Sequence, residues 1–309
     1  MPSCSRCQSQ AVLRLDYANL DLCGACFSGL FVKRVAKANR DFAMLDAGDV
    51  VAVGVSGGKD SAALLYSLWK LSKKTGFSLK PIVANEGIAG YRDEAMKDAH
   101  ALCRRLGLEL TVVAYQDLAG HSMDDIMKIR DEKALPFSSC GVCGVLRKDG
   151  LNKAARKVGA TKLAIGHNTD DVAQTVLMNL MRGDAEGFGR FGVVSSGSGS
   201  DSLVPRVKPL VYNLEKECAL YCVVNDLPFH LAECPYSAEA FRGPVKDFLN
   251  NVEQKHPGTK FKIVSAFLKL KQKLPAPKEW TATAGACALC GAQSSAAICR
   301  RCVLVDSLG

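Results

Sequence analysis

The sequence lacks any long hydrophobic run and any pattern typical of export. No stretch approaches the roughly 18 uninterrupted apolar residues that a membrane span requires, so we expect no membrane segment. The first residues, MPSCSRCQ, lack the basic start and apolar core of a secretion signal. Of the 309 residues, 48% are hydrophobic and 23% are charged, which is ordinary for a globular protein. We therefore expect a cytoplasmic protein with one large domain and small additions.

Cysteine, by contrast, is abundant. Without an export signal, the 14 cysteines are expected to be metal ligands or catalytic groups rather than disulfides. Four near the start have the spacing C-x2-C-x15-C-x2-C, and four near the end have C-x2-C-x8-C-x2-C. Each quartet suits a structural Zn²⁺ that staples a segment with little core, and closed four-cysteine ribbons favour zinc over an iron–sulfur cluster. We predict zinc ribbons at 1–30 and 275–309, with the ligands Cys4, Cys7, Cys23, Cys26, Cys287, Cys290, Cys299 and Cys302.

The formal charge of +9 favours a polyanionic partner such as RNA. Two occupied zinc ribbons reduce this bias, because four thiolates with one Zn²⁺ carry −2. The charge then falls from +9 to +5. This net positive charge favours binding of RNA only if the fold gathers the basic side chains on one face.

Between the ribbons, buried-strand and helical patterns alternate. This alternation predicts an α/β fold with a doubly wound parallel sheet and helices on both faces over residues 31–274. We also expect a mobile loop from Gly183 to Ser202, a mainly helical region from Leu214 to about Leu270, and a linker at Pro275 to Pro277. The predicted strands are Val50 to Val55, Pro81 to Ala84, Leu110 to Tyr115 and Lys162 to Gly166. The predicted helices are Ser61 to Lys74, Tyr91 to Leu106, Val145 to Val158 and Asp171 to Met181.

The segment SGGKDS follows the first strand and opens the first of these helices. Its glycines let the backbone approach a phosphate, and the helix start adds unpaired N–H groups and a positive dipole end. The G-x4-G-K-[ST] spacing of a P-loop is absent, and the segment matches instead the PP-loop of ATP pyrophosphatases, which cleave ATP between the α and β phosphates. A Gly-rich turn with a chance lysine is disfavoured by the strand before and the helix after. The predicted ATP contacts are Ser56, Gly57, Gly58, Lys59, Asp60 and Ser61.

Three further cysteines form a separate candidate site. Cys140 and Cys143 lie at the start of a predicted helix, and Cys234 lies far away in AECPYS. The helix start and the nearby Arg147 and Lys148 are expected to lower the thiol pKa values. If the three meet, they suit a [4Fe–4S] cluster with one open iron, or a persulfide and disulfide relay. Spacing alone leaves these open, along with a purely structural role, whereas Cys103, Cys218 and Cys222 are expected to pack in the core.

The chain resembles the cytoplasmic tRNA 2-thiolation protein 1 family, within the TtcA/TtuA-type tRNA sulfurtransferases. The similarity runs over almost the whole chain and includes both ribbons. Two of its segments, EGIAGYRD and MNLMRGD, look more like the branch acting on the wobble uridine. The motifs that carry it are VVAVGVSGGKDS (50–61), NEGIAGYRD (85–93), LTVVAYQDL (110–118), CGVCGVLRK (140–148), GHNTDDVAQTVLMNLMRGD (166–184) and ECPYSAEAFRG (233–243).

The resemblance implies a reaction. The O2 of uridine 34 attacks the α-phosphate of ATP, pyrophosphate leaves, and sulfur then displaces AMP to give 2-thiouridine. It also implies that Cys140, Cys143 and Cys234 are catalytic and hold a [4Fe–4S] cluster. A ubiquitin-like sulfur carrier or free sulfide would supply the sulfur, and the working unit would be a homodimer or a complex with a sister subunit. Family members usually have aspartate at the position of Asn85.

Residues after the fourth strand are further candidates, because ligands bind at strand ends in such sheets. Gly166 and His167 are expected to contact the nucleotide, although His167 could equally be structural. Asp170 and Asp171 are expected to coordinate Mg²⁺ or organise the transition state, with helix capping as the alternative, and the resemblance favours Asp171 as catalytic. Arg182, which ends the helix, suits an RNA contact or compensation of the helix dipole.

Other functions compete with thiolation of uridine 34. One is thiolation at another tRNA position, such as uridine 54 or cytidine 32. A second is a different PP-loop enzyme, such as a lysidine synthetase or amidotransferase, which needs no set of three cysteines. A third is a non-catalytic zinc-ribbon RNA-binding subunit, which the intact SGGKDS argues against. RNA binding itself is expected to involve Lys-rich stretches such as Lys260 to Lys273, unless that stretch is a solvated helix face.

Overall fold

The centre of the protein is a six-stranded sheet. The computed structural model describes residues 2–195, 203–239, 241–273 and 285–309. The strand order is β5-β4-β3-β6-β8-β7, and every pair is parallel except β7 with β8. The predicted parallel α/β sheet is confirmed, with β7 as an antiparallel edge strand. The strands are β3 (Val50–Gly54), β4 (Ser78–Asn85), β5 (Thr111–Ala114), β6 (Lys162–Ala164), β7 (Val194–Ser195) and β8 (Arg206–Val207).

The order of the strands fixes where a ligand can bind. The chain runs outward from β3 through β4 to β5, then returns to the opposite side of β3 with β6. In an open α/β sheet such a reversal leaves a crevice at the carboxyl ends of the two strands. The loop after β3 is SGGKDS and the loop after β6 is GHN, so the two predicted ATP-binding segments face the same crevice.

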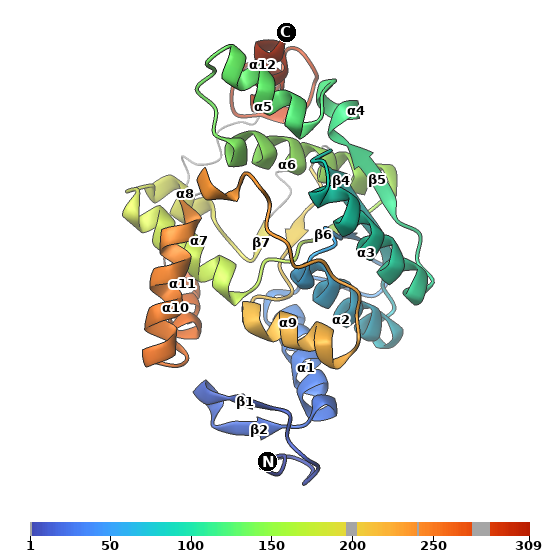
Figure 1. Cartoon of the computed structure of the whole chain (residues 1–309), viewed down its shortest axis with the longest axis vertical. Helices are drawn as coiled ribbons and strands as arrows, with labels where there is room; N and C mark the ends of the chain where they lie inside the picture. The colour runs from blue at the N-terminus through green and yellow to red at the C-terminus, as the bar shows by residue number, and fades with distance from the viewer. Residues whose placement is uncertain (1, 196–202, 240, 274–284) are drawn as a thin grey trace.

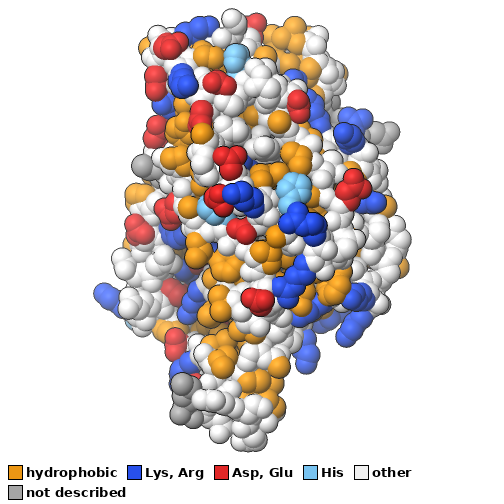
Figure 2. All heavy atoms as spheres, turned by 45° about the vertical axis from the view of Figure 1, so that its right-hand side comes forward, with side chains coloured by type: hydrophobic (Ala, Val, Ile, Leu, Met, Phe, Trp, Pro, Cys, Tyr) orange, Lys and Arg blue, Asp and Glu red, His pale blue; other side chains and the backbone are white. Residues whose placement is uncertain are grey.

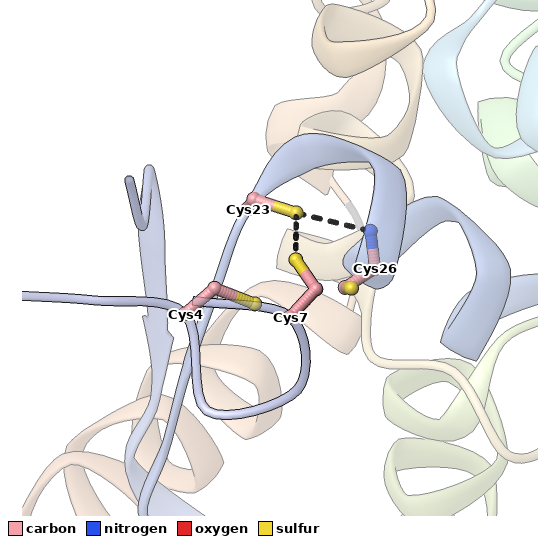
Figure 3. A group of neighbouring side chains, drawn as sticks. All are labelled: Cys4, Cys7, Cys23 and Cys26. Atoms are coloured by element: carbon pink, nitrogen blue, oxygen red, sulfur yellow. Dashed lines mark hydrogen bonds between the residues drawn. The ribbon is translucent and has the colours of Figure 1, made fainter. Parts of the chain in front are cut away.

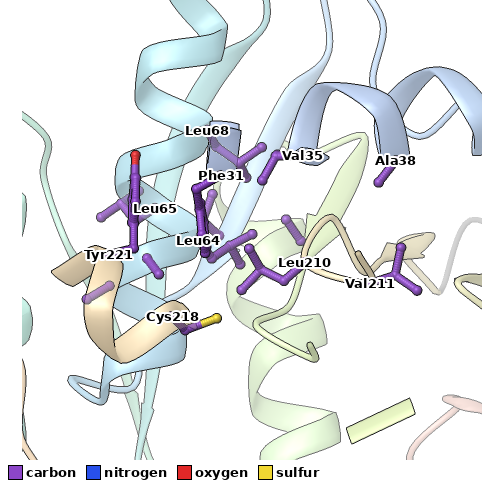
Figure 4. Close-up of a cluster of buried hydrophobic side chains, with 14 of the residues drawn as sticks. Phe31, Val35, Ala38, Leu64, Leu65, Leu68, Leu210, Val211, Cys218 and Tyr221 are labelled. Atoms are coloured by element: carbon purple, nitrogen blue, oxygen red, sulfur yellow. The ribbon is translucent and has the colours of Figure 1, made fainter. Parts of the chain in front are cut away.

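Helices cover the sheet on both sides (Figure 1). Three of them, α1 (Gly24–Phe42), α2 (Lys59–Thr75) and α9 (Glu215–Val224), pack against one another around large apolar side chains. Figure 4 shows this cluster, in which the rings of Phe31 and Tyr221 stack with centroids 4.0 Å apart. Cys218 and Cys222 are fully buried, and Cys103 is 1% exposed, as predicted. Each large apolar side chain buried in this way contributes about 1.5–3 kcal/mol.

The remaining helices form two groups around the crevice. The first group is α7 (Thr169–Met181), α8 (Ala185–Arg190), α10 (Arg242–Lys255) and α11 (Thr259–Lys273), and α7 packs against the other three. The second group contains α4 (Tyr115–Ala119), α5 (Met123–Glu132) and α6 (Ser139–Lys157), and α3 (Tyr91–Leu106) lies beside α2 and β4. Among the described residues, no helix has the length and apolarity needed to cross a lipid bilayer.

The two cysteine ribbons lie at opposite ends of the long axis (Figure 1). The first holds a hairpin of β1 (Leu13–Leu15) and β2 (Leu20–Leu22) joined by the 3-10 helix η1 (Asp16–Ala18), and continues into α1. The second holds β9 (Gly285–Ala286), β10 (Gln293–Ser294) and α12 (Arg300–Leu308), and α12 packs on α5 and α6. The predicted linker at 275–277 lies outside the described residues.

Two local predictions differ from the structure. The helix predicted from Val145 starts six residues earlier, because the Ser138 hydroxyl accepts a hydrogen bond from the backbone N–H of Gly141 at 3.1 Å and caps it. The predicted loop from Gly183 contains α8, capped by Asp184, which accepts from the N–H of Gly187 at 2.7 Å, and then β7. Residues 196–202 of that prediction lie outside the described residues.

Candidate active site

The loop after β3 is held in shape by its own hydroxyls. The Ser61 Oγ accepts from the backbone N–H of Ser56 at 3.0 Å and donates to the carbonyl oxygen of Gly58 at 2.9 Å. A fixed loop at the start of α2 therefore presents N–H groups where an anion is favoured.

Gly57 is required by close packing. Its φ is +89°, and a Cβ atom there would lie 2.0 Å from the carbonyl oxygen of Ala95. The carbonyl oxygen of Gly57 also accepts a hydrogen bond from the N–H of His230 at 2.8 Å, which ties the loop to the chain before Cys234. Only glycine fits this position.

A cavity of about 620 Å³ opens where the loops after β3 and β6 meet. This volume lies in the range of small-ligand and cofactor sites. Of the predicted ATP contacts, Ser56, Asp60, Ser61, Gly166 and His167 line it. Gly166 approaches closely, since a Cβ there would lie 3.3 Å from the backbone nitrogen of Ser61. Gly57, Gly58 and Lys59 belong to the same loop but do not line the cavity.

Three acidic residues line this cavity: Glu86, which pairs with two arginines, and Asp60 and Asp171. Asp60 is held by the Asn168 amide at 3.0 Å, and Asp171 accepts from the Asn168 N–H at 3.1 Å as part of the cap of α7. Burial raises the pKa of each carboxyl, and the charge of Asp171 raises the pKa of Asp60 further against the opposing effect of Lys59. A divalent cation would relieve this repulsion, so the pair fits Mg²⁺. Asp171 thus also caps its helix.

Asp170 does not have the predicted metal-binding position. Its carboxylate is 3% exposed, forms an ion pair with Lys260, and accepts from the N–H of Glu215 at 2.8 Å. It is absent from the cavity lining. The prediction of Mg²⁺ coordination was wrong for this residue, because its charge is already compensated inside the protein.

Lys59 points toward a glutamate rather than into the cavity. Its ammonium lies 2.9 Å from Glu215 and 3.1 Å from Asp60, and Glu215 also contacts Lys246 at 3.0 Å. Burial alone would lower the pKa of Lys59, but Asp60 and Glu215 raise it above its usual value. Contact between Lys59 and a phosphate therefore requires the side chain to leave Glu215.

His167 is neutral at physiological pH. Although the imidazole reaches the open cavity, the surrounding protein and then the charges of Lys208 and Arg242 lower its pKa to about 3. A neutral ring can donate or accept a hydrogen bond but adds no charge to the site.

The fold brings the three middle cysteines to one side of the cavity. Cys143 and Cys234 pack in the same cluster, and the start of α6 touches the segment after Cys234 through the Ser139 hydroxyl, 3.2 Å from the carbonyl oxygen of Tyr236. Among the described residues, only the two ribbons gather metal-ligand atoms within 4.8 Å of one another. Three thiols with one position left open are the donor set of a [4Fe–4S] cluster that can bind an external ligand, so Cys140, Cys143 and Cys234 suit such a group by their chemistry.

The expected lowering of the thiol pKa by the helix start is wrong for Cys143. Burial raises the pKa of this thiol, and Arg147 and the Tyr115 hydroxyl only partly oppose the rise. The Arg147 Nη2 lies 3.1 Å from the Cys143 Sγ, and Lys148 makes no such contact. Burial raises the pKa of Cys234 as well. Both thiols therefore need a bound metal to remain deprotonated at neutral pH.

Both ribbons have the geometry of a closed zinc site. In each, the four sulfur atoms lie within 4.8 Å of one another. Figure 3 shows the first set, where the Sγ atoms of Cys7 and Cys23 are 3.6 Å apart, and in the second set Cys290 and Cys299 are 3.7 Å apart. Tetrahedral zinc with bonds of about 2.3 Å places its sulfurs about 3.8 Å apart. The predicted ligands are thus assembled in both.

Comparison with known proteins decides the family. The PP-loop domain profile matches residues 31–251. Cytoplasmic tRNA 2-thiolation protein 1 of Mus musculus is 39% identical, over 99% of this chain and 73% of its own length. The chain belongs to the cytoplasmic tRNA 2-thiolation protein 1 family. The tRNA 2-thiolation protein NcsA of Haloferax volcanii is 35% identical, over 99% of this chain and 98% of its own length. The solved U34-tRNA thiolase NcsA of Methanococcus maripaludis, with its [4Fe–4S] cluster, aligns with a TM-score of 0.84 and 32% identity, over 100% and 97% of the two chains.

Two residues that the sequence analysis did not single out, Glu86 and Arg92, hold the PP-loop in place in this thiolation-family protein. Arg92 is 3% exposed, and its guanidinium donates to the carbonyl oxygen of Ser56 at 2.6 Å and pairs with Glu86 at 2.8 Å. Glu86 also pairs with Arg147 at 3.0 Å. The signal was present, since Glu86 and Arg92 lie in the NEGIAGYRD motif, but only the fold shows what they hold. The amide oxygen of Asn85 accepts from the N–H of Gly87 at 3.1 Å.

Basic and acidic side chains are unevenly distributed over the surface of this thiolation-family protein. On the face in Figure 2, basic side chains gather at the lower right, whereas the upper part carries both signs. Within the Lys-rich stretch from Lys260 to Lys273, Lys260 itself is not available to RNA, because it is 5% exposed and neutralises Asp170. For the rest of the stretch, RNA contact stays a prediction. Arg182 stacks on Phe241, with its guanidinium carbon 4.5 Å from the ring centroid.

Proposed function

We propose that this protein thiolates the wobble uridine of tRNA at C2, using ATP to activate the base. The observation that carries the proposal is the position of Arg147. It lines the ATP cavity, and its Nη2 lies 3.0 Å from Glu86 and 3.1 Å from the Cys143 Sγ. One side chain thus joins the wall of the nucleotide site to the three-cysteine set, so adenylation and sulfur transfer can occur on one bound base.

In the first step, the O2 of uridine 34 attacks the α-phosphorus of ATP, an O–P bond forms, and pyrophosphate leaves. The loop from Ser56 to Ser61 and the start of α2 hold the phosphates through backbone N–H groups. Asp60 and Asp171 would hold a Mg²⁺ ion, which would offset the charge of the leaving pyrophosphate. Gly166 and His167 contact the nucleoside part. The base then carries AMP on O2.

In the second step, sulfur adds at C2, the C2–O bond breaks, and AMP leaves with the former O2. A [4Fe–4S] cluster held by Cys140, Cys143 and Cys234 would supply an iron position that binds the incoming sulfur. Arg147 lies between the cysteines and the cavity, where its charge stabilises negative charge on the sulfur or the departing phosphate. Two Zn²⁺ ions would hold the ribbons.

The relatives' names support a cytoplasmic location and a tRNA substrate. The sulfur source is a ubiquitin-like carrier or sulfide, and the working unit is a homodimer or a complex with a sister subunit. The domains are the ribbon at 1–30, the catalytic domain at 31–274 and the ribbon at 275–309.

The test is reconstitution without oxygen. Purified protein is assayed for iron, acid-labile sulfide and zinc, then incubated with ATP, sulfide and an unmodified tRNA transcript containing uridine 34. We expect 2-thiouridine at position 34 with AMP and pyrophosphate released, and loss of both cluster and thiolation in Cys234→Ala. Cys103→Ala, a buried cysteine outside the site, serves as the control. Thiolation by Cys234→Ala would overturn the role of the cluster, and modification at uridine 54 or cytidine 32 would overturn the choice of base.

A further inference from the structure

Three basic side chains from separate elements lie in or beside the ATP cavity: Lys148 on α6 and Arg206 on β8, which line it, and Arg300 at the start of α12, whose charge acts on Lys148. Arg206 donates from Nη2 to the backbone carbonyl oxygen of Lys148 at 2.9 Å. The next residue after Arg300, Arg301, forms an ion pair of 3.3 Å with Asp149 on α6. The C-terminal ribbon is therefore anchored beside Lys148, close enough for the charge of Arg300 to act on the Lys148 ammonium.

These three cations lack acidic partners. The other two cations of the cavity are compensated, because Arg147 pairs with Glu86 and Arg242 lies 3.7 Å from Asp171. Within the described part of the chain, Lys148, Arg206 and Arg300 have no ion pair. Burial and then the charges of Arg206, Arg300 and Arg190 lower the pKa of Lys148, and no carboxylate offsets them. Like charges gathered in this way are costly unless an anion binds between them.

We propose that Lys148, Arg206 and Arg300 bind the phosphate backbone of the RNA whose base enters the cavity. This inference rests on the proposed function and names the part of the site that holds the RNA. ATP already has the loop after β3 and the start of α2 for its phosphates. Lys148 and Arg206 line the cavity, whereas Arg300 lies outside its lining on a separate ribbon. Cations that line the cavity together with one beside it suit a polyanion longer than ATP.

The test separates RNA binding from catalysis. The full chain binds an unmodified uridine-34 tRNA transcript across a series of KCl concentrations, and the slope of log affinity against log salt is measured. We expect Lys148→Gln and Arg300→Gln each to reduce the slope by about 1, since each removed phosphate contact releases about one counterion fewer. Arg206→Lys should restore most of the slope lost in Arg206→Gln. Lys157→Gln, at the exposed far end of α6, is the matched control and should leave the slope unchanged.

A second arm measures binding of a non-hydrolysable ATP analogue to the same variants. We expect Arg300→Gln to bind it as tightly as the parent protein. Loss of nucleotide affinity with an unchanged tRNA slope would overturn the inference and assign the cations to the triphosphate. A tRNA slope that falls as expected, in a protein that thiolates no tRNA, would support the RNA site while overturning the proposed function.

Discussion

At the scale of single residues, Gly57 is the position in the loop from Ser56 to Ser61 where no side chain fits. A Cβ atom would meet the Ala95 carbonyl at 2.0 Å, and the positive φ adds strain for any other residue. We expect Gly57→Ala to lose ATP binding by at least tenfold, because the loop must move away from α3. Binding of the non-hydrolysable analogue measured by calorimetry checks this. Gly48→Ala is a control with a similar φ of +87° and open space for its Cβ, and it should bind normally. Equal affinity for both variants would contradict the prediction.

His167 gives a prediction about acid stability. In the folded protein its pKa is lowered from the ordinary value of 6.5 to about 3. Between these values the unfolded chain binds a proton that the folded protein does not, so stability is lost as pH falls from 6.5 toward 3. We expect His167→Asn to lose less stability than the parent protein between pH 7 and pH 5, measured as the shift in urea midpoint.

The parent protein, unfolded in urea over the same pH range, provides the comparison for that measurement. A His167→Asn variant with the same loss of stability as the parent would show that the ring is already charged in the folded state.

At the scale of helices, the ion pair of Asp170 with Lys260 joins α7 to α11 inside the protein. Removing one partner leaves a buried charge, which typically costs about 3–5 kcal/mol, whereas removing both can be nearly neutral. We therefore expect Lys260→Met to destabilise strongly and Asp170→Asn with Lys260→Met to recover much of the loss. Urea unfolding measures both.

Lys262→Met, on the exposed side of α11, is the control and should change the free energy of unfolding by about 0.5 kcal/mol or less. A small effect of Lys260→Met would mean that this lysine is free to contact RNA, as its sequence context first suggested.

How much the sequence revealed differs between elements. The positions of β3, of α3 and of the SGGKDS loop were predictable. The strand is a continuous apolar run, the helix has apolar periodicity, and the loop has glycines typical of a turn. The start of α6 was not, because SSCGVCG has little apolar pattern and its helix depends on the Ser138 cap. β7 and β8 are two residues each, too short to carry a period.

The site shows the same division. Metal-ligand spacing along the chain revealed the ribbon cysteines, whose partners lie nearby in sequence. Other contacts join residues far apart in sequence, such as the hydrogen bond from Arg92 to the carbonyl oxygen of Ser56 and the ion pair of Lys260 with Asp170. Only the packing of the whole chain decides such contacts. Local pattern also placed Lys260 on the surface, because a lysine in an amphipathic helix is usually solvated.

At the scale of the whole molecule, the two ribbons lie at opposite ends but differ in what they touch (Figure 1). The C-terminal ribbon is held on the body by Arg301, which donates to the carbonyl oxygen of Leu118 at 2.7 Å, and by Lys133, which donates to that of Leu308 at 2.9 Å. Arg300 can reach RNA only while this ribbon is folded. No described residue of either ribbon lines the cavity itself, and the N-terminal ribbon lies at the opposite end of the long axis from the ribbon that carries Arg300 (Figure 1).

Matched variants of the two ribbons test this difference. Cys7 and Cys290 are both exposed members of their quartets, so Cys7→Ser and Cys290→Ser should each reduce bound zinc from two ions to one. We expect Cys290→Ser to weaken tRNA binding and reduce its salt slope by about 1, because Arg300 loses its support. Cys7→Ser should keep the contribution of Arg300, and both should bind the ATP analogue normally. If the slope of log affinity against log salt fell equally in the two variants, both ribbons would contribute equally to RNA binding. That result would contradict the role proposed for Arg300, which lies on the C-terminal ribbon alone.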